Sequence, residues 1–272
     1  MNKILYRDCI FCGKDNKFNV PLQYSVDHWQ LKQCSDCDFI YLENVPCYEL
    51  LEEKFSWEKT SEAETARKVE TEPIRKTLSD LLKTIRKKWF KRDKLTKLIN
   101  KYFISGRVLD IGCSSGSVLK NLKENYEPWG IEISKALAIE AQKSLKNRAS
   151  QIVHANAVAG TQELPENFFR GVIMSAFLEH EANPKLLLKN VFRILMPSGY
   201  CIIKVPNFAS INRVVRGKNW CGFRFPDHVN YFTPNNLIKI CENIGFQIEK
   251  FTFLDRIPIS DNMWIVIKKP KI

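Results

Sequence analysis

Apolar runs that alternate with amphipathic helical runs dominate the chain from Gly106 onward. The first, RVLDIGCSSGSVLKNL over residues 107–122, is a strand-like run, a turn of small residues and a helix-like run. Further strand-like runs follow in PWGIEI, SQIVHAN, FFRGVIMSA and GYCIIKVP, and the tail predicts two more in FQIEKFTFL and MWIVIKKP. Apolar strands separated by helices predict an α/β domain with a parallel sheet and crossover helices.

The turn in VLDIGCSSGSVL predicts a ligand site. The strand is expected to end near Ile111 and the helix to begin near Ser117. Gly112 and Gly116 let the backbone approach a ligand, and free N–H groups point out of the helix start. A dinucleotide fingerprint requires G-x-G-x-x-G, whereas this turn reads G-x-S-x-G, so a pyrophosphate is not the expected ligand.

With Asp110 before it, the turn resembles the first motif of class I S-adenosylmethionine-dependent methyltransferases, which holds the amino-acid part of the cofactor. The resemblance places Glu132, 22 residues later, on the ribose hydroxyls, and Asn156 where an acid usually meets the adenine amino group. The run VIMSAFLEHEANPKLLLKNVFRILMPSGYCIIKVPN is similar to the family's fourth strand, helix and fifth strand. Ser114 replaces the commonest glycine, and a small residue is tolerable there if its φ is negative.

The resemblance covers roughly residue 106 to the C-terminus. It implies an enzyme with a Rossmann-like fold, in which a mostly parallel seven-stranded sheet has an antiparallel last strand. Methyl transfer from S-adenosylmethionine is the implied activity. Cofactor contacts are implied for ten residues: Asp110, Gly112, Cys113, Ser114, Ser115, Gly116, Glu132, Ile133, Asn156 and Ala157.

Two CxxC pairs precede this domain, Cys9 with Cys12 and Cys34 with Cys37, 21 residues apart. Four thiolates at this spacing predict a tetrahedral Zn²⁺ site, which is structural because no position stays open for a catalytic water. A metal also supplies folding free energy that so short a segment lacks. Disulfides or a redox pair are the alternatives; the expected reducing compartment disfavours the first, and the missing βαβ context the second.

Three segments follow from these patterns: a zinc-ribbon-like domain over 1–45, a helical connector or lid over 46–104 and the methyltransferase domain over 105–272. The net charge of +12 is uneven, because residues 83–107 hold ten Lys or Arg and one acidic residue. That stretch is interpreted as a solvated helix or as a surface for phosphate groups. Without a long apolar run or a signal peptide, we expect no transmembrane segment and a cytoplasmic location.

Two histidines and an acid are the candidate catalytic residues. His180 follows the predicted fourth strand, at the edge where open α/β sheets bind ligands, and His228 lies in the irregular stretch FRFPDHVNYFT. A neutral imidazole suits removal of a proton, and Asp227 would orient or bind the substrate. The alternative role for either histidine is to cap or bridge loops.

A four-cysteine segment followed by this domain also resembles deoxysugar C-methyltransferases and related enzymes of sugar and polysaccharide modification. Their Tyr-x-Glu-His pattern corresponds to Phe225, Asp227 and His228, and their earlier histidine to His180. Because phenylalanine replaces the tyrosine, we expect methylation of a hydroxyl, with a carbon as the alternative. The expected acceptor is a small sugar, nucleotide-sugar or glycolipid-type molecule, and the basic stretch slightly favours one that bears phosphate.

Two other classes of function remain open. The basic stretch and the cysteines also suit a nucleic-acid methyltransferase acting on RNA, although SAFLEH stands where base-amino methyltransferases carry an Asn-Pro-Pro-Tyr type of motif. Departures from the family pattern at Ser114, Asn156 and Phe225 suit a cofactor-binding scaffold without catalysis.

Overall fold

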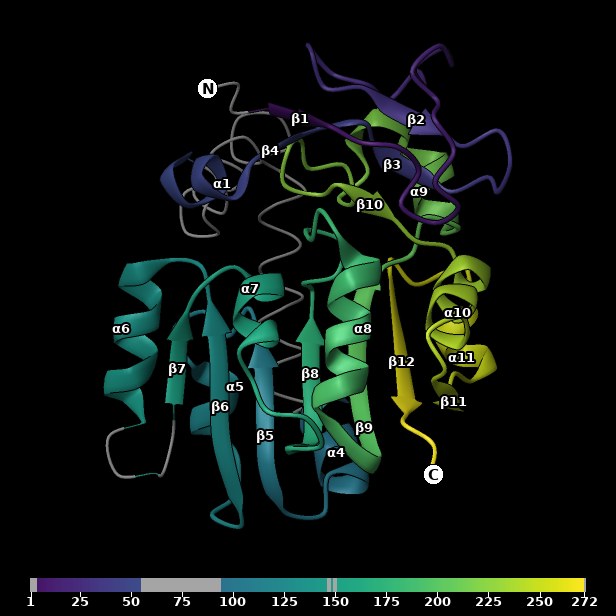
Figure 1. The fold of residues 1–272 in the computed structure, drawn as a ribbon. Helices are drawn as coiled ribbons and strands as arrows, with labels where there is room; N and C mark the ends of the chain where they lie inside the picture. Colours follow the sequence, from purple (N-terminus) through teal and green to yellow (C-terminus); the bar gives the residue numbers. More distant parts are fainter. Residues whose placement is uncertain (1–3, 55–93, 146–147, 149–150, 272) are drawn as a thin grey trace, which may run out of the picture.

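A seven-stranded sheet forms the centre of the computed structural model, which describes residues 4–54, 94–145, 148 and 151–271 (Figure 1). Its strand order is β11-β12-β9-β8-β5-β6-β7. The strands are β5 (Gly106–Ile111), β6 (Tyr126–Glu132), β7 (Gln151–His154), β8 (Phe169–Ser175), β9 (Leu195–Pro206), β11 (Gln247–Lys250) and β12 (Asn262–Lys268). The strands from β5 to β9 pair in parallel, whereas β12 is antiparallel to β9. This arrangement confirms the predicted fold.

Helices cover both faces of the sheet because its central strands are apolar on both sides. They are α4 (Lys94–Tyr102), α5 (Ser117–Lys120), α6 (Lys135–Ser144), α7 (Ala157–Gln162), α8 (Pro184–Ile194) and α10 (Pro234–Glu242). Met174 of β8 packs in the same cluster as Leu187 of α8, whereas its neighbour Ile173 packs in the cluster that holds Ile99 of α4. Alternate strand residues therefore bury opposite faces, as the pleat of a strand requires.

Two small antiparallel sheets lie above the C-terminal edge of the central sheet (Figure 1). Their strands are β1 (Ile4–Tyr6), β2 (Leu31–Gln33), β3 (Ile40–Leu42), β4 (Asn44–Pro46) and β10 (Asn230–Tyr231). β1 pairs with β4, and β3 lies between β2 and β10, with Asn230 opposite Tyr41. Since β10 comes from the C-terminal half, the segment predicted as a separate zinc-ribbon-like domain shares a sheet with the domain that follows it.

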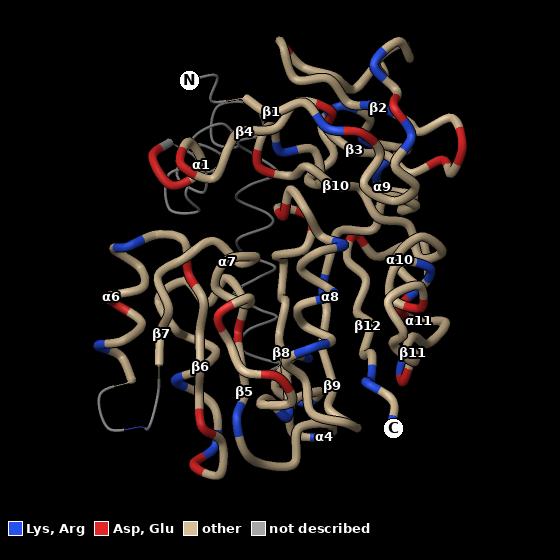
Figure 2. The backbone as a smooth tube through the Cα atoms, viewed as in Figure 1, with Lys and Arg blue, Asp and Glu red and all other residues tan. Residues whose placement is uncertain are grey.

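The described parts of the predicted 46–104 connector are helical. They are α1 (Tyr48–Lys54) and α4, and residues 55–93, with most of the predicted basic stretch, lie outside the described residues. α1 carries several glutamates, seen as red segments in Figure 2. One of them, Glu52, lies 3.0 Å from Nε2 of His154 at the end of β7. This contact holds α1 against the C-terminal edge of the sheet.

The predicted C-terminal strand pair is confirmed only in part. β11 pairs with β12, but the FTFL stretch that was predicted as strand contains helix α11 (Phe253–Arg256). The Asp255 carboxylate accepts hydrogen bonds from the backbone N–H and the hydroxyl of Thr252, at 3.1 and 2.7 Å. It also forms ion pairs with Lys94 and Lys250 at 2.6 and 2.7 Å. This capping and charge pairing outweigh the strand preference of the aromatic residues.

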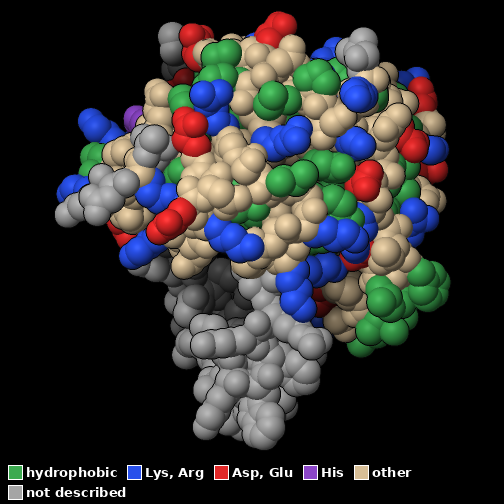
Figure 3. Space-filling model, turned by 90° about the horizontal axis from the view of Figure 1, so that it is seen from below, with side chains coloured by type: hydrophobic (Ala, Val, Ile, Leu, Met, Phe, Trp, Pro, Cys, Tyr) green, Lys and Arg blue, Asp and Glu red, His purple; other side chains and the backbone are tan. Residues whose placement is uncertain are grey.

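Charged side chains of both signs are spread over the outside of the molecule. Seen from below the view of Figure 1, Lys and Arg lie among acidic, neutral and apolar side chains (Figure 3). The coloured part of this face therefore mixes both charges rather than presenting one basic groove. None of the described helices is long and apolar enough to cross a membrane.

Candidate active site

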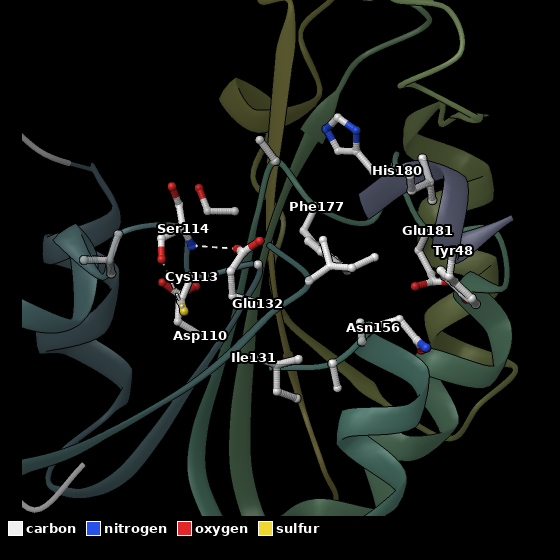
Figure 4. Close-up of a pocket in the computed structure, with 18 of the residues that line it drawn as sticks. Tyr48, Asp110, Cys113, Ser114, Ile131, Glu132, Asn156, Phe177, His180 and Glu181 are labelled. Carbon is white, nitrogen blue, oxygen red and sulfur yellow. Dashed lines mark hydrogen bonds between the residues drawn. The ribbon is translucent and has the colours of Figure 1, made fainter. Parts of the chain in front are cut away.

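A cavity of about 360 Å³ opens at the C-terminal ends of β5, β6 and β8, where a parallel sheet gathers its strand-end loops (Figure 4). α1 forms part of its wall. Its lining includes two groups of polar side chains and backbone. The turn side comprises Asp110, Gly112, Cys113, Ser114 and Glu132, and the histidine side comprises Tyr48, His180, Glu181 and Asp227.

The turn after β5 has a left-handed backbone at a non-glycine residue. The condition of a negative φ at Ser114 is not met, because its φ is 50°. This region costs a residue with a Cβ roughly 1–2 kcal/mol, which explains why glycine is the commonest residue at this position. Glu132 helps to hold the turn, since its Oε2 accepts a hydrogen bond from the Ser114 N–H at 2.9 Å.

Position 112 needs a glycine because the ring of Phe177, which the sequence analysis did not identify, packs against its backbone. A Cβ on Gly112 would lie 2.3 Å from the ring of Phe177, and the glycine has a φ of 74°. Phe177 follows β8 and lies between the turn side and His180 (Figure 4). The glycine therefore allows an aromatic ring to pack against the backbone in the middle of the cavity.

Two buried carboxylates lie close together on the turn side. Asp110 is 3% exposed and Glu132 is 7% exposed. Glu132 also accepts a hydrogen bond from the Ser134 N–H at 2.9 Å, whereas the Asp110 carboxylate accepts none from the described residues. Burial, and then the charge of Glu132, raise the pKa of Asp110 well above its ordinary value. A cationic or hydrogen-bond-donating ligand would stabilise such a pair.

Asn156 lies in the wall of the cavity between β7 and α7. Its Oδ1 accepts a hydrogen bond from the Ala159 N–H at 2.9 Å and so caps α7, which leaves one lone pair of this oxygen for a ligand. The adenine contact therefore stays a prediction. Among the other predicted cofactor residues, Cys113, Ile133 and Ala157 line the cavity, whereas Ser115 and Gly116 do not.

His180 and Asp227 form a hydrogen-bonded pair on the histidine side. The His180 Nδ1–H donates to Asp227 Oδ1 and to the Asp227 carbonyl oxygen, both at 2.9 Å, and Arg224 lies 2.7 Å from Asp227 Oδ2. Burial disfavours the imidazolium, but the Asp227 and Glu179 carboxylates outweigh burial and raise the pKa of His180. Burial also disfavours the Asp227 carboxylate, yet His180 and Arg224 lower its pKa to about 2. Asp227 is therefore ionised.

His228 lies behind His180. Their rings meet edge to face, with centroids 4.6 Å apart, and the His228 Nδ1–H donates to the Gly222 carbonyl at 2.8 Å. Burial, and then the neighbouring His180, lower the pKa of His228 to about 3, so it stays neutral. The structure thus brings the three predicted catalytic residues together, but of these only His180 and Asp227 line the cavity.

α1 contributes residues that the sequence did not predict. The Tyr48 hydroxyl donates a hydrogen bond to Glu181 Oε1 at 2.5 Å, and Leu51 lines the cavity one turn further along the helix. Burial raises the pKa of Glu181. The only sequence signal was the Glu-His-Glu run that contains Glu181, because nothing in the pattern around Tyr48 shows that it reaches the other half of the chain.

A buried arginine joins the N-terminal sheets to the histidine side. Arg7 donates to the carbonyls of Leu42 and Ala182 at 2.8 Å each and to the carbonyl of Val229. Burial lowers its pKa to about 10, so it remains protonated. Because Ala182 and Val229 follow His180 and His228 closely, Arg7 holds both histidine loops in place.

The comparisons with known proteins agree with this geometry. A family profile described as a methyltransferase domain matches residues 74–250. The chain belongs to this methyltransferase family. Two curated relatives are ubiquinone biosynthesis O-methyltransferases from Psychrobacter arcticus and Psychrobacter cryohalolentis, 24% and 23% identical over 179 residues. Each match covers 58% of this methyltransferase and 66% of the relative, just under two thirds of the relative's length.

Solved structures share the fold of the methyltransferase. An S-adenosylmethionine-dependent methyltransferase from Archaeoglobus fulgidus is 23% identical with a TM-score of 0.53, covering 65% of this chain and 91% of that one. The [4+2]-cyclase SpnF is 16% identical with a TM-score of 0.54, covering 66% and 81%. At these identities the likeness shows the fold alone.

The turn side of the methyltransferase fits S-adenosylmethionine, the methyl donor that its family implies. The cofactor carries a positive sulfonium and a positive ammonium group, and a cation beside the buried Asp110 would favour the ionised form of this carboxyl, whose pKa burial and Glu132 raise in the ligand-free protein. The Asp110 carboxylate also has acceptor capacity that the described residues leave unused, and Glu132 faces the same cavity. These residues would therefore hold the donor at the ends of β5 and β6.

The four predicted metal ligands converge in the methyltransferase. Their sulfurs all lie within 4.8 Å of one another, with 3.5 Å between Cys9 and Cys37 and 3.4 Å between Cys12 and Cys34. A disulfide needs about 2.05 Å, so these are thiols. Tetrahedral Zn²⁺ with bonds of about 2.3 Å separates its sulfurs by roughly 3.8 Å, which fits this cluster. Zinc itself stays a prediction.

Proposed function

We propose that the methyltransferase transfers the methyl group of S-adenosylmethionine to a hydroxyl oxygen of a small acceptor on the histidine side. The observation that carries this proposal is the His180–Asp227 pair, which opens onto the same cavity as Asp110 and Glu132. Such a displacement needs the nucleophile aligned with the methyl group and protected from water. The bound donor supplies an electrophilic methyl group whose leaving group is a neutral thioether.

In this proposal His180 accepts the hydroxyl proton. Because its Nδ1–H donates to Asp227, the neutral ring carries its lone pair on Nε2, and the ionised Asp227 stabilises the imidazolium that forms. The electron pair of the acceptor oxygen then forms the new O–C bond while the C–S bond breaks. His228 stays neutral and holds the His180 ring from behind.

The acceptor class is argued from the cavity wall and from the names of the relatives. The word O-methyltransferase in those names favours oxygen as the acceptor atom, and ubiquinone biosynthesis favours a phenolic ring. Phe177 and Leu51 supply apolar surface for such a ring. A sugar is the second candidate, since Tyr48 and Glu181 offer hydrogen bonds to further hydroxyls. The described lining contains no Lys or Arg, which favours a neutral acceptor over a phosphate-bearing one.

Calorimetric titration with S-adenosylmethionine tests the cofactor part of the proposal. The wild-type protein should bind, Asp110→Ala should lose binding, and Asp15→Ala, which removes an exposed carboxylate elsewhere, should bind normally. Equal affinity of all three proteins would contradict the assignment of the turn side.

Methyl transfer to a simple catechol and to a neutral hexoside, followed with labelled methyl donor, tests the acceptor part. We expect turnover on the catechol and its loss in His180→Gln, with His28→Gln as the control because His28 is exposed in the N-terminal segment. Turnover only on the hexoside would select the sugar candidate. Undiminished turnover in His180→Gln would contradict the role of His180.

A further inference from the structure

Three potential metal-binding side chains, one of which is His180 of the histidine side, lie close together. Glu179, His180 and His228 each offer a donor atom within 4.8 Å of the donors of the other two. Glu179 is 1% exposed and His228 is 5% exposed, whereas His180 reaches the cavity. One loop supplies Glu179 and His180, and a loop almost 50 residues further along supplies His228, so folding alone brings the set together.

The tautomers of both histidines suit metal binding. The Nδ1–H of His180 donates to the Asp227 carboxylate, and the Nδ1–H of His228 donates to the Gly222 carbonyl. Each neutral ring therefore carries its lone pair on Nε2. Histidines that bind metals typically donate their other N–H to a carboxylate or a carbonyl in this way.

One oxygen of the cluster's carboxylate lacks a hydrogen-bond partner among the described residues. Glu179 Oε2 is buried and has no hydrogen-bond partner among the described residues, and Oε1 lies 4.0 Å from His180 Nε2, too far for a hydrogen bond. An isolated buried carboxylate is costly unless a cation or a donor satisfies it. Neither His180 nor Asp227 donates a hydrogen bond to Glu179 Oε2.

We propose that Glu179, His180 and His228 bind one divalent transition-metal ion, with its remaining coordination positions directed to the cavity beside His180. Two imidazoles and one carboxylate suit Mn²⁺, Fe²⁺ or Zn²⁺ better than Mg²⁺ or Ca²⁺, which prefer oxygen ligands. Bonds of about 2.0–2.2 Å would bring the donors roughly 3–3.4 Å apart, so the side chains close by about 1 Å around the ion.

The metal site would take part in the proposed methyl transfer, and this catalytic role rests on the proposed function. Metal binding itself does not depend on the proposed function. An acceptor hydroxyl bound to the ion loses its proton to solvent water more readily, because the cation stabilises the oxygen anion that then attacks the methyl group. His180 then serves as a ligand, and in the metal-free protein the same Nε2 takes the proton directly. Methyl transfer in Mn²⁺ should therefore exceed transfer in a chelator by about tenfold or more.

Titration with Mn²⁺, followed by the loss of the free-ion EPR signal, tests the site. Mn²⁺ is a suitable probe because it competes poorly for the thiolates of the four-cysteine cluster. We expect one ion per wild-type chain. Affinity should fall about 10–100-fold in Glu179→Gln and in His228→Gln, where the amide preserves size and a hydrogen-bonding group, and should persist in the control His28→Gln.

Binding of S-adenosylmethionine by each variant provides the check that it is folded. Absence of stoichiometric Mn²⁺ binding in the wild type would overturn the proposal. Wild-type affinity for Mn²⁺ in both site variants would overturn it as well. Methyl transfer by a wild-type protein that binds no Mn²⁺ would contradict the metal site alone. Mn²⁺ binding without transfer to any hydroxyl would leave the metal site standing and remove the proposed function.

Discussion

The two sides of the cavity are built in different ways. The turn side comes from one short stretch, residues 110–134, in which Glu132 ties two loops together through backbone N–H groups. The histidine side is assembled from segments near both ends of the chain, with Tyr48 bonded to Glu181 and Arg7 bonded to Ala182 and Val229. In the proposed function, donor binding is therefore a local property of the central sheet, whereas acceptor binding depends on how the N-terminal sheets dock.

Loss of the four-cysteine cluster should produce the largest difference between the effects on acceptor methylation and on donor binding. We expect Cys34→Ser to lower methyl transfer by roughly 100-fold or more, because a structural metal supplies much of the folding free energy of so small a segment. Affinity for S-adenosylmethionine should stay near the wild-type value, since the turn side lies in the central sheet. Turnover and calorimetry on one preparation, with zinc content measured, check both expectations.

Cys47→Ser is the matched control for that variant, because Cys47 lies outside the cluster. If Cys34→Ser lost donor affinity together with turnover, the two sides would not be independent.

Glu132→Ala should produce the opposite pattern. Removing its carboxylate takes away two expected hydrogen bonds to the donor, at about 1.5 kcal/mol each, and should weaken S-adenosylmethionine binding about 100-fold. The KM for the acceptor, measured at saturating donor, should stay unchanged. Glu124→Ala, an exposed glutamate just before β6, serves as the control. A rise in acceptor KM alone would contradict the assignment.

Tyr48→Phe should affect only the binding of the acceptor, and by less than Glu132→Ala affects the binding of the donor. The hydroxyl that donates to Glu181 is lost, and one hydrogen bond of about 1.4 kcal/mol corresponds to an acceptor KM roughly tenfold higher. Donor affinity should not change. Tyr6→Phe is the control, because Tyr6 is 72% exposed on β1. Equal kinetics in both variants would remove Tyr48 from the acceptor site.

Ser114→Gly gives the smallest effect. Glycine relieves the left-handed strain at φ 50° but adds freedom to the unfolded chain, so we expect a gain of less than about 1 kcal/mol in the free energy of unfolding. Thermal unfolding should show a small rise in Tm. Ser115→Gly, at a position that is not left-handed, should instead lower the Tm. A lower Tm in Ser114→Gly would mean that the serine side chain matters more than the strain.

Most of the fold and most of the turn side were predictable from the sequence, because they depend on local patterns. Alternating apolar runs predicted the central strands, and the family resemblance assigned Asp110 and Glu132 to one ligand, in agreement with the cavity that both residues line. The sign of φ at Ser114 was not predictable, since the motif shows a residue type but not the hydrogen bond from its N–H to Glu132. Helix α11 was missed because its stability depends on Asp255 meeting Lys94, far away in the sequence.

The histidine side was predicted only in its named residues. A pattern search finds His180 and Asp227, but the partners Tyr48 and Glu181 are separated by more than 130 residues. Arg7 and Val229 are separated by more than 220 residues. No periodicity carries information over such distances, so these contacts become visible only when the docked N-terminal sheets are seen.

The pairing of β3 with β10 also sets an order of events during synthesis. Tyr41 meets Asn230, which leaves the ribosome about 190 residues later. At about 5–20 residues per second, roughly 10–40 s pass between them. During that time the four cysteines are already made, while the sheet that covers them lacks its third strand. The segment of the protein that is synthesised first therefore cannot complete its sheet until most of the chain has been made.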